Sequence, residues 1–173
     1  MIGSIMQIEY EISEQDFLNA QKLAVRKAPK LGTRLLFRIL PFWGVLLFLG
    51  VAWPVFRKGF ILKTEMLVPF SFAVLCLGSP LLLKRAYQKA YRRNPSYQGK
   101  RSLILNENGL ALSGDTFSSQ LKWEHFIRFV EDEKVLLLYQ GSQVVQIVPK
   151  RQLSQEEILE LKEAFTRHIA SKR

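Results

Sequence analysis

Two long apolar runs dominate the pattern of hydrophobic and polar positions along the chain. Residues 39–56 and 66–83 each contain eighteen positions without a charged side chain. As α-helices, runs of this length would measure roughly 27 Å, close to the hydrocarbon thickness of a bilayer. The pattern therefore predicts a transmembrane helical hairpin within residues 31–95, with spans of about 37–56 and 66–84.

Two other structures fit the same runs. The helices could form the core of a soluble protein, although fully apolar helices of this length are rare in a domain of this size. A shallow hairpin that enters and leaves the same leaflet would give the same terminal topology as a full crossing. Prolines within the runs weaken both helices, but transmembrane helices tolerate proline better than soluble ones do. These are Pro41, Pro54, Pro69 and Pro80.

Basic residues flank the two runs unequally and predict their orientation. Residues 26–38 carry five Lys or Arg and residues 84–101 carry seven, whereas the connecting residues 57–65 carry three. Lys and Arg are enriched in the cytoplasmic flanks of membrane proteins. We therefore expect a multi-pass protein of the cytoplasmic (inner) membrane with both termini in the cytoplasm.

The segment before the first run, residues 1–30, shows a strand pattern followed by a helix pattern. Residues 5–12 alternate between apolar and polar positions from Met6 onward, which is the period of a half-buried strand. Ser13 and Asp16 then have the spacing of a helix-capping box. The pattern predicts a helix over residues 14–28.

The C-terminal part, residues 96–173, has the pattern of successive short strands and one final helix. Ser154 and Glu157 form a second capping-box sequence, and apolar residues then recur every three or four positions. The second apolar helix should continue to about Arg93 before the strands begin. The expected strands are residues 101–106, 110–113, 117–123, 126–131, 134–139 and 143–148.

Six strands and a capping helix come close to a pleckstrin-homology-like β-barrel, which has seven strands. The N-terminal strand is on the predicted cytoplasmic side and could supply the seventh. The fold class that follows is an α+β membrane protein: a transmembrane hairpin joined to a cytoplasmic, antiparallel, pleckstrin-homology-like barrel over residues 96–173.

Several short motifs give the chain a resemblance to a known family, the YcxB-like bacterial membrane proteins. They are Tyr10 with Ser13–Phe17, Asn108–Leu110, Lys122–Trp123, Glu131, Leu136–Tyr139 and Val148–Arg151, together with the two-run hairpin. The resemblance implies a bacterial inner-membrane protein with a C-terminal pleckstrin-homology-like domain. It implies no catalytic activity and supplies no active-site residues.

The net charge of +10 is concentrated around the apolar runs. Residues 22–101 contain sixteen Lys or Arg and one acid, whereas residues 102–173 contain nine basic and ten acidic residues. This distribution fits anionic lipid headgroups and argues against nucleic acid, which favours a basic face on the folded domain itself. The basic collar after the second run could simply orient the protein, or it could form a specific headgroup site. The candidate headgroup contacts are Lys84, Arg85, Lys89, Arg92, Arg93, Lys100, Arg101, Lys150 and Arg151.

No catalytic, cofactor or metal signature is present in the sequence. Cys76 is the only cysteine, and His125 and His168 are on different predicted elements without a neighbouring cluster of ligands. Acidic residues 131–133 are most simply a solvated turn, and Trp123 is most simply a core residue. We therefore expect a protein that is not an enzyme and binds neither a cofactor nor a metal.

Two classes of function remain after these exclusions. The first is a membrane-anchored interaction module that binds a protein partner or anionic lipid headgroups at the cytoplasmic face. The alternative is a small channel or transporter subunit formed when hairpins assemble into a homo-oligomer. Gly44 and Gly50 would allow close helix packing, but the apolar runs lack the charged residues that usually line a pathway.

Overall fold

The computed structural model describes residues 6–27, 39, 42–50, 52, 53, 57, 67–141 and 144–169. The chain divides into two compact units. The sheet unit consists of Met1–Ala24 together with Tyr87–Arg173, and the helical unit is Val25–Ala86. The N-terminal strand and helix are thus part of the same unit as the C-terminal strands.

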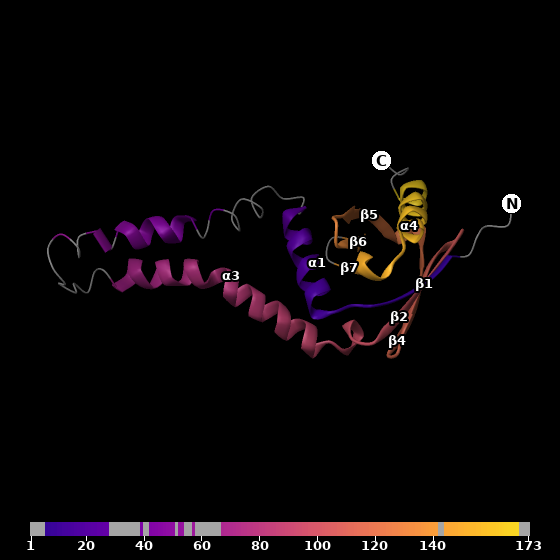
Figure 1. The fold of residues 1–173 in the computed structure, drawn as a ribbon, viewed down its shortest axis with the longest axis horizontal. Helices are drawn as coiled ribbons and strands as arrows, with labels where there is room; N and C mark the ends of the chain where they lie inside the picture. Colours follow the sequence, from indigo (N-terminus) through magenta and orange to yellow (C-terminus); the bar gives the residue numbers. More distant parts are fainter. Residues whose placement is uncertain are drawn as a thin grey trace. The chain divides into compact units, whose positions relative to one another are not determined.

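A four-stranded antiparallel sheet forms the first part of the sheet unit (Figure 1). Its strands, in spatial order, are β1 (Met6–Glu11), β2 (Lys100–Asn106), β3 (Gly109–Gly114) and β4 (Phe117–Lys122). β1 pairs with β2 along its whole length, from Met6 opposite Leu105 to Glu11 opposite Lys100. The prediction that the N-terminal strand joins the sheet is confirmed.

A second, three-stranded antiparallel sheet follows, with the order β5–β6–β7. The strands are β5 (Phe126–Glu131), β6 (Val135–Gln140) and β7 (Val144–Pro149). Within the described residues no ladder joins β4 to β5, so the predicted closed barrel is instead two sheets. The cause is local: residues Trp123–His125 form a 3₁₀ turn, η3, which interrupts the strand before β5 begins.

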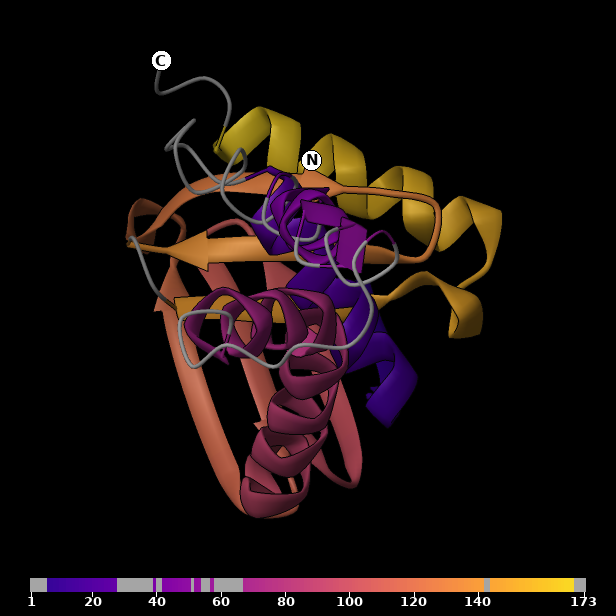
Figure 2. The ribbon, with the colours of Figure 1, turned by 90° about the vertical axis from the view of Figure 1, so that its left-hand side faces the viewer.

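Helix α4 (Gln155–His168) completes this part of the unit and lies beside the three-stranded sheet in both views (Figure 1 and Figure 2). The predicted capping box is confirmed, because the Glu157 amide donates to Ser154 Oγ at 3.2 Å and the Ser154 amide donates to Glu157 Oε2 at 2.7 Å. The fully buried Phe165 ring contacts those of Trp123 and Phe129, with centroids 6.0 and 5.9 Å away. Such aromatic pairs stabilise a core beyond the area they bury.

Helix α1 (Glu14–Arg26) begins where the sequence predicts. The Asp16 amide donates to Ser13 Oγ at 3.1 Å, and the Ser13 amide donates to Asp16 Oδ2 at 2.9 Å. The buried face of α1 adds Phe17, Ala20 and Leu23 to the core that both sheets share. The helix ends at Arg26, two residues before the predicted end: Lys27 is in a turn, and Ala28 lies outside the described residues.

Helix α3 (Leu67–Arg93) matches the second apolar run and its predicted continuation. It passes through Pro80 without ending, and Asn94 then caps the short η2 turn (Pro95–Tyr97) by accepting from the Ser96 amide at 3.1 Å. Among the described residues, one helix is long and apolar enough to cross a membrane, namely Val68–Arg93 within α3.

The first apolar run is described only in part. Residues 39, 42–50, 52 and 53 are helical, and the rest of the predicted first span lies outside the described residues. Gly44 meets α3 closely: a Cβ there would lie 2.8 Å from Cys76 Cβ and 3.4 Å from the Ala73 carbonyl oxygen. Ala73 and Cys76 are both buried. Small side chains therefore allow the two helices of this unit to approach each other, as in membrane helix pairs.

Gly109 provides a test of the sheet register. A Cβ at this position would lie 2.1 Å from the backbone carbonyl oxygen of Leu121 on β4, so the two strands would have to separate. We expect Gly109→Ala to lower the free energy of unfolding of the full chain in detergent micelles by about 2 kcal/mol or more. Gly50→Ala is the matched control, because no atom lies within 4 Å of its Cβ position. Equal melting curves for wild type and Gly109→Ala would contradict the register.

Candidate functional site

A groove of about 710 Å³ opens in the sheet unit where α1 and α4 both begin. We call it the α1–α4 groove. Four segments line it: residues 13–19, the β5–β6 turn at residues 133–134, residues 150–153 after β7, and residues 155–162 of α4. These segments are far apart in the sequence, and the fold brings them together.

Cations outnumber carboxylates among the side chains that line this groove. The cations are Lys134, Lys150, Arg151 and Lys162, and the carboxylates are Asp16 and Glu133. The starts of the two helices add little to this charge, because both are capped and both first turns carry acidic residues. The excess of cations among the lining side chains is therefore the feature that would favour an anionic group.

Glu131, on β5 beside the groove, holds two of these cations. Its carboxylate forms ion pairs with Lys150 and, at 2.7 Å, with Lys162. The Lys150 ammonium also donates to the Asp132 carbonyl oxygen at 2.7 Å. Burial alone would raise the pKa of Glu131, but the hydrogen bonds and charges of the two lysines outweigh it and lower that pKa below its ordinary value.

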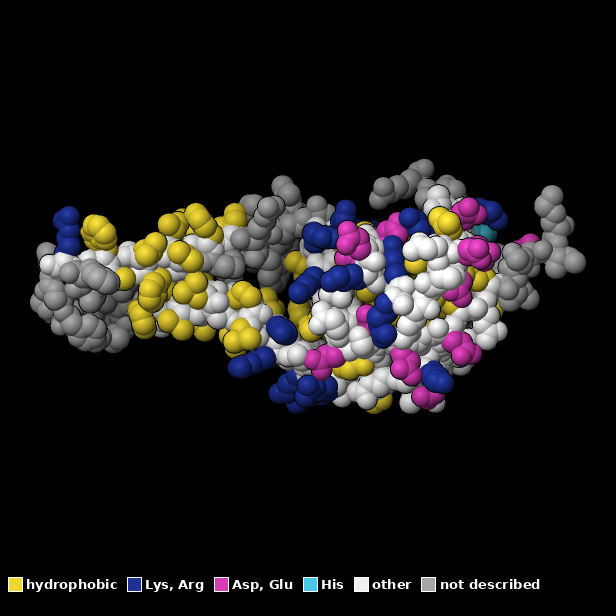
Figure 3. Space-filling model, viewed as in Figure 1, with side chains coloured by type: hydrophobic (Ala, Val, Ile, Leu, Met, Phe, Trp, Pro, Cys, Tyr) yellow, Lys and Arg dark blue, Asp and Glu magenta, His cyan; other side chains and the backbone are white. Residues whose placement is uncertain are grey.

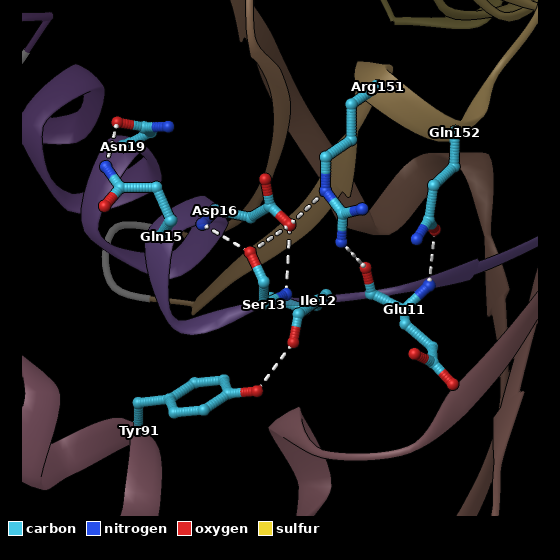
Figure 4. A network of polar contacts seen from close by, with 9 residues as sticks. All are labelled: Glu11, Ile12, Ser13, Gln15, Asp16, Asn19, Tyr91, Arg151 and Gln152. Atoms are coloured by element: carbon cyan, nitrogen blue, oxygen red, sulfur yellow. Dashed lines mark hydrogen bonds and ion pairs between the residues drawn. The ribbon is translucent and has the colours of Figure 1, made fainter.

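Asp16 is the centre of a second polar network (Figure 4). Its side chain is buried, and Oδ2 accepts hydrogen bonds from the Ser13 hydroxyl at 2.7 Å and from Arg151 Nε at 3.0 Å. Arg151 Nη2 also donates to the Glu11 carbonyl oxygen at 3.3 Å, and the Glu11 amide donates to Gln152 Oε1 at 2.7 Å. These contacts join the corner between β1 and α1 to the turn that follows β7.

Lys150 and Arg151, two of the predicted headgroup contacts, therefore lie in the groove and are engaged with carboxylates. Most of the other predicted contacts are exposed along the end of α3 and the start of β2. These are Lys84, Arg85, Lys89, Arg93 and Lys100. Arg92 is also exposed and forms an ion pair with Glu14, 3.2 Å between Nε and Oε2.

Arg101 differs from the other predicted contacts because its side chain is only 4% exposed. Its guanidinium donates to the Ser96 carbonyl oxygen and lies over the rings of Tyr97 and Phe117, at 5.5 and 5.1 Å from their centroids. Arg101 thus acts inside the sheet unit and presents almost no surface to a headgroup.

Arg101 also faces Tyr10 across the β1–β2 pair. Burial raises the pKa of Tyr10 to about 12, although the positive charge of Arg101 acts to lower it.

The tyrosines of the basic collar pack toward the core of the sheet unit. The Tyr91 hydroxyl donates to the Ile12 carbonyl oxygen at 2.7 Å, and the Phe17 ring lies 4.9 Å from that of Tyr97. Glu14 accepts a hydrogen bond from Gln88 Nε2 at 2.6 Å in addition to its pair with Arg92. The last turns of α3 are therefore fastened to the first turn of α1.

The described residues contain no group of three or more His, Cys, Asp and Glu side chains that could hold a metal ion. Trp123 is buried and donates from Nε1 to the Asn106 carbonyl oxygen at 3.0 Å. The imidazole of His168 stacks on its ring at 4.7 Å between centroids. Trp123 and His168 therefore pack as structural residues.

Comparison with protein families gives a match over part of the chain. Residues 105–165 match the family model described as YcxB-like protein. The matched residues run from the end of β2 into α4 and include Glu131, Lys134 and Arg151, so the match supports the resemblance over this part of the chain. Neither the search of curated proteins nor the search of solved structures produced a match.

Asp16 should contribute more to stability than its partner Arg151. Asp16→Asn weakens both the helix cap and the ion pair of a buried carboxylate, so we expect a loss of about 2 kcal/mol in the free energy of unfolding. Arg151→Gln should cost at most about 1 kcal/mol, because the arginine side chain is 49% exposed. Urea unfolding of the full chain in micelles measures both. A larger loss for Arg151→Gln would show that the ion pair outweighs the cap.

Glu131 should make stability depend on pH in the acidic range. Its pKa is lower in the folded chain than the ordinary value of 4.5, so its contribution is present above that value and disappears as the pH falls through the folded pKa. We expect wild type to exceed Glu131→Gln in melting temperature at pH 7 and at pH 5, and the difference to shrink as the pH falls below 4.5. Glu133→Gln, at an exposed position of the same turn, is the control. A pH-independent difference would contradict the assignment.

Proposed function

We propose that this chain is a membrane-anchored, non-catalytic interaction module of the bacterial cytoplasmic membrane. The observation that carries the proposal is where apolar surface is exposed. Of the seventeen large apolar residues that are exposed in the described part of the chain, fifteen are in the helical unit, and the other two are Ile127 and Leu159. Apolar side chains cover the visible face of the two helices (Figure 3). A bilayer would cover this surface, and large groups of exposed apolar side chains mark membrane or protein contacts.

The exposure of these side chains also argues against the alternative in which the two helices form the core of a soluble protein. Only 11% of the most apolar eighteen-residue window of α3 is buried, whereas a core helix would be mostly buried. The contact between Gly44 and the segment around Cys76 supports a hairpin, because it buries small residues and leaves the large apolar ones outward. In this proposal both apolar runs span the membrane and both termini lie in the cytoplasm.

In the same proposal the sheet unit is the part that binds, and its arrangement is pleckstrin-homology-like. Four plus three antiparallel strands and a C-terminal helix support this assignment. The ligand is a protein partner or anionic lipid headgroups. The exposed cations Lys84, Arg85, Lys89 and Arg93 follow the apolar part of α3 directly, where they would meet headgroups.

The alternative, a channel or transporter subunit built from several hairpins, has one observation in its favour. Gly50 and Gly78 leave open space in which another helix could pack. Against it, the hydroxyls of Ser71 and Ser79 donate to the carbonyl oxygens of their own helix, at 2.9 and 2.8 Å. The described part of α3 up to Leu83 has no charged side chain to line a pathway. Ion flux through vesicles containing the purified chain would favour the alternative.

The anchor and its topology can be tested in cells with single cysteines placed in a Cys76→Ala background. We expect the chain to stay in the membrane fraction after carbonate extraction. A membrane-impermeant maleimide added to spheroplasts should label Lys58→Cys, in the predicted connection, but should label Glu107→Cys, which is exposed in the turn between β2 and β3, only after lysis. Release by carbonate would contradict the anchor. Protection of both cysteines would indicate a shallow hairpin, and labelling of Glu107→Cys alone would indicate the reverse orientation.

A further inference from the structure

The α1–α4 groove has the features of a peptide-binding site. We infer that it binds an acidic segment of a protein partner, one that combines carboxylates with an aliphatic side chain. This inference rests on the proposed function and specifies its ligand. The groove volume of about 710 Å³ falls within the roughly 300–1,000 Å³ that is usual for ligand sites.

Lys134 is the cation most available to such a ligand. Its side chain is exposed, and its ammonium forms no ion pair or hydrogen bond with any residue that the structure describes. The backbone around it is well fixed, because the Lys134 amide donates to Asp132 Oδ1 at 2.9 Å and its carbonyl oxygen accepts from the Lys150 amide at 2.9 Å. A carboxylate of the partner would find an unpaired charge on an ordered turn.

Arg151 and Lys162 are held in place by carboxylates of the fold but remain accessible. Their side chains are 49% and 39% exposed. A guanidinium has five N–H donors and an ammonium has three, so the contacts with Asp16, Glu11 and Glu131 leave further donors for a ligand. Cations that are already positioned lose less side-chain entropy when a ligand binds.

The apolar part of the groove explains why the ligand should carry an aliphatic side chain. Leu159 is 58% exposed on α4, and Leu153 and Ile158 line the groove beside it. The side-chain amides of Gln15, Asn19 and Gln155 lie along the same groove and can both donate to and accept from a peptide backbone. A phosphate group alone would use the cations and leave this apolar surface uncovered.

The residues that line the groove also favour a protein over a lipid headgroup. The exposed cations that suit headgroups follow the apolar part of α3 and do not line the groove. In this inference the cations of the basic collar bind lipid headgroups, and the cations of the groove bind a peptide.

Selection from a random peptide library tests the inference. The full chain, in nanodiscs of neutral phosphatidylcholine, would be used to select phage-displayed dodecapeptides. We expect enriched sequences with two or more Asp or Glu next to Leu, Ile or Phe. The enrichment should be lost with Lys134→Glu and kept with Lys122→Glu, which makes the same change of charge at an exposed β4 position outside the groove.

The binding constant of a selected peptide, made synthetically, gives the quantitative result. We expect Lys134→Glu to weaken binding about tenfold and Lys122→Glu to change it less than twofold, since a tenfold change is about 1.4 kcal/mol. Leu159→Ser should weaken the same peptide about fivefold. Unchanged melting temperatures would show that the variants fold.

Three results would overturn the inference. The first is a library that enriches no acidic sequences, and the second is a peptide that binds Lys134→Glu and Lys122→Glu equally. The third is a library that enriches no peptide while soluble glycerophosphate binds to wild type and does not bind to Lys134→Glu. That result would assign the groove to a lipid headgroup. If peptide binding fails but the cysteine labelling gives the expected topology, only the assignment of the groove is wrong. If carbonate releases the chain from the membrane, the proposed function itself is wrong.

Discussion

The pairing of β1 with β2 is the constraint on which the rest of the structure depends. β1 precedes the helical unit and β2 follows it, and their ladder runs from Met6 opposite Leu105 to Glu11 opposite Lys100. Two strands can form this ladder only if both ends of the helical unit emerge on the same side of any membrane it enters. If the helical unit crosses a membrane, the β1–β2 ladder allows only an even number of crossings, and this condition does not depend on the distribution of Lys and Arg.

Other contacts reinforce this pairing, and the candidate site grows out of them. Asp16 caps α1 and binds Arg151, while Glu14 binds Gln88 and Arg92 of α3. These contacts connect the N-terminal segment to the last turns of α3 and to the turn that follows β7. The groove forms at the first of these junctions, and the carboxylates that stabilise the fold also hold its cations in position.

Sequence reasoning was most successful where structure is determined locally. Both capping boxes and the seven strands follow from short-range patterns, and the structure places them within one or two residues of the expected bounds. The division into two sheets was missed, because the 3₁₀ turn at Trp123–His125 has no strong turn signal. The burial of Arg101 between two aromatic rings depends on partners that only the folded sheet brings together. The groove was missed for the same reason, because its lining comes from four segments that are far apart in the sequence.

The β1–β2 ladder also has a consequence for how the chain is made. β1 leaves the ribosome before β2, which appears only after the whole helical unit has been synthesised. Pairs that are distant in sequence form slowly, so this ladder can be completed only after the helical unit has been synthesised. Until then β1 is an unpaired edge, and its exposed Glu9 and Glu11 are the kind of charged residues that discourage wrong pairing between chains. These two glutamates would thus discourage wrong pairing of β1 before β2 is available.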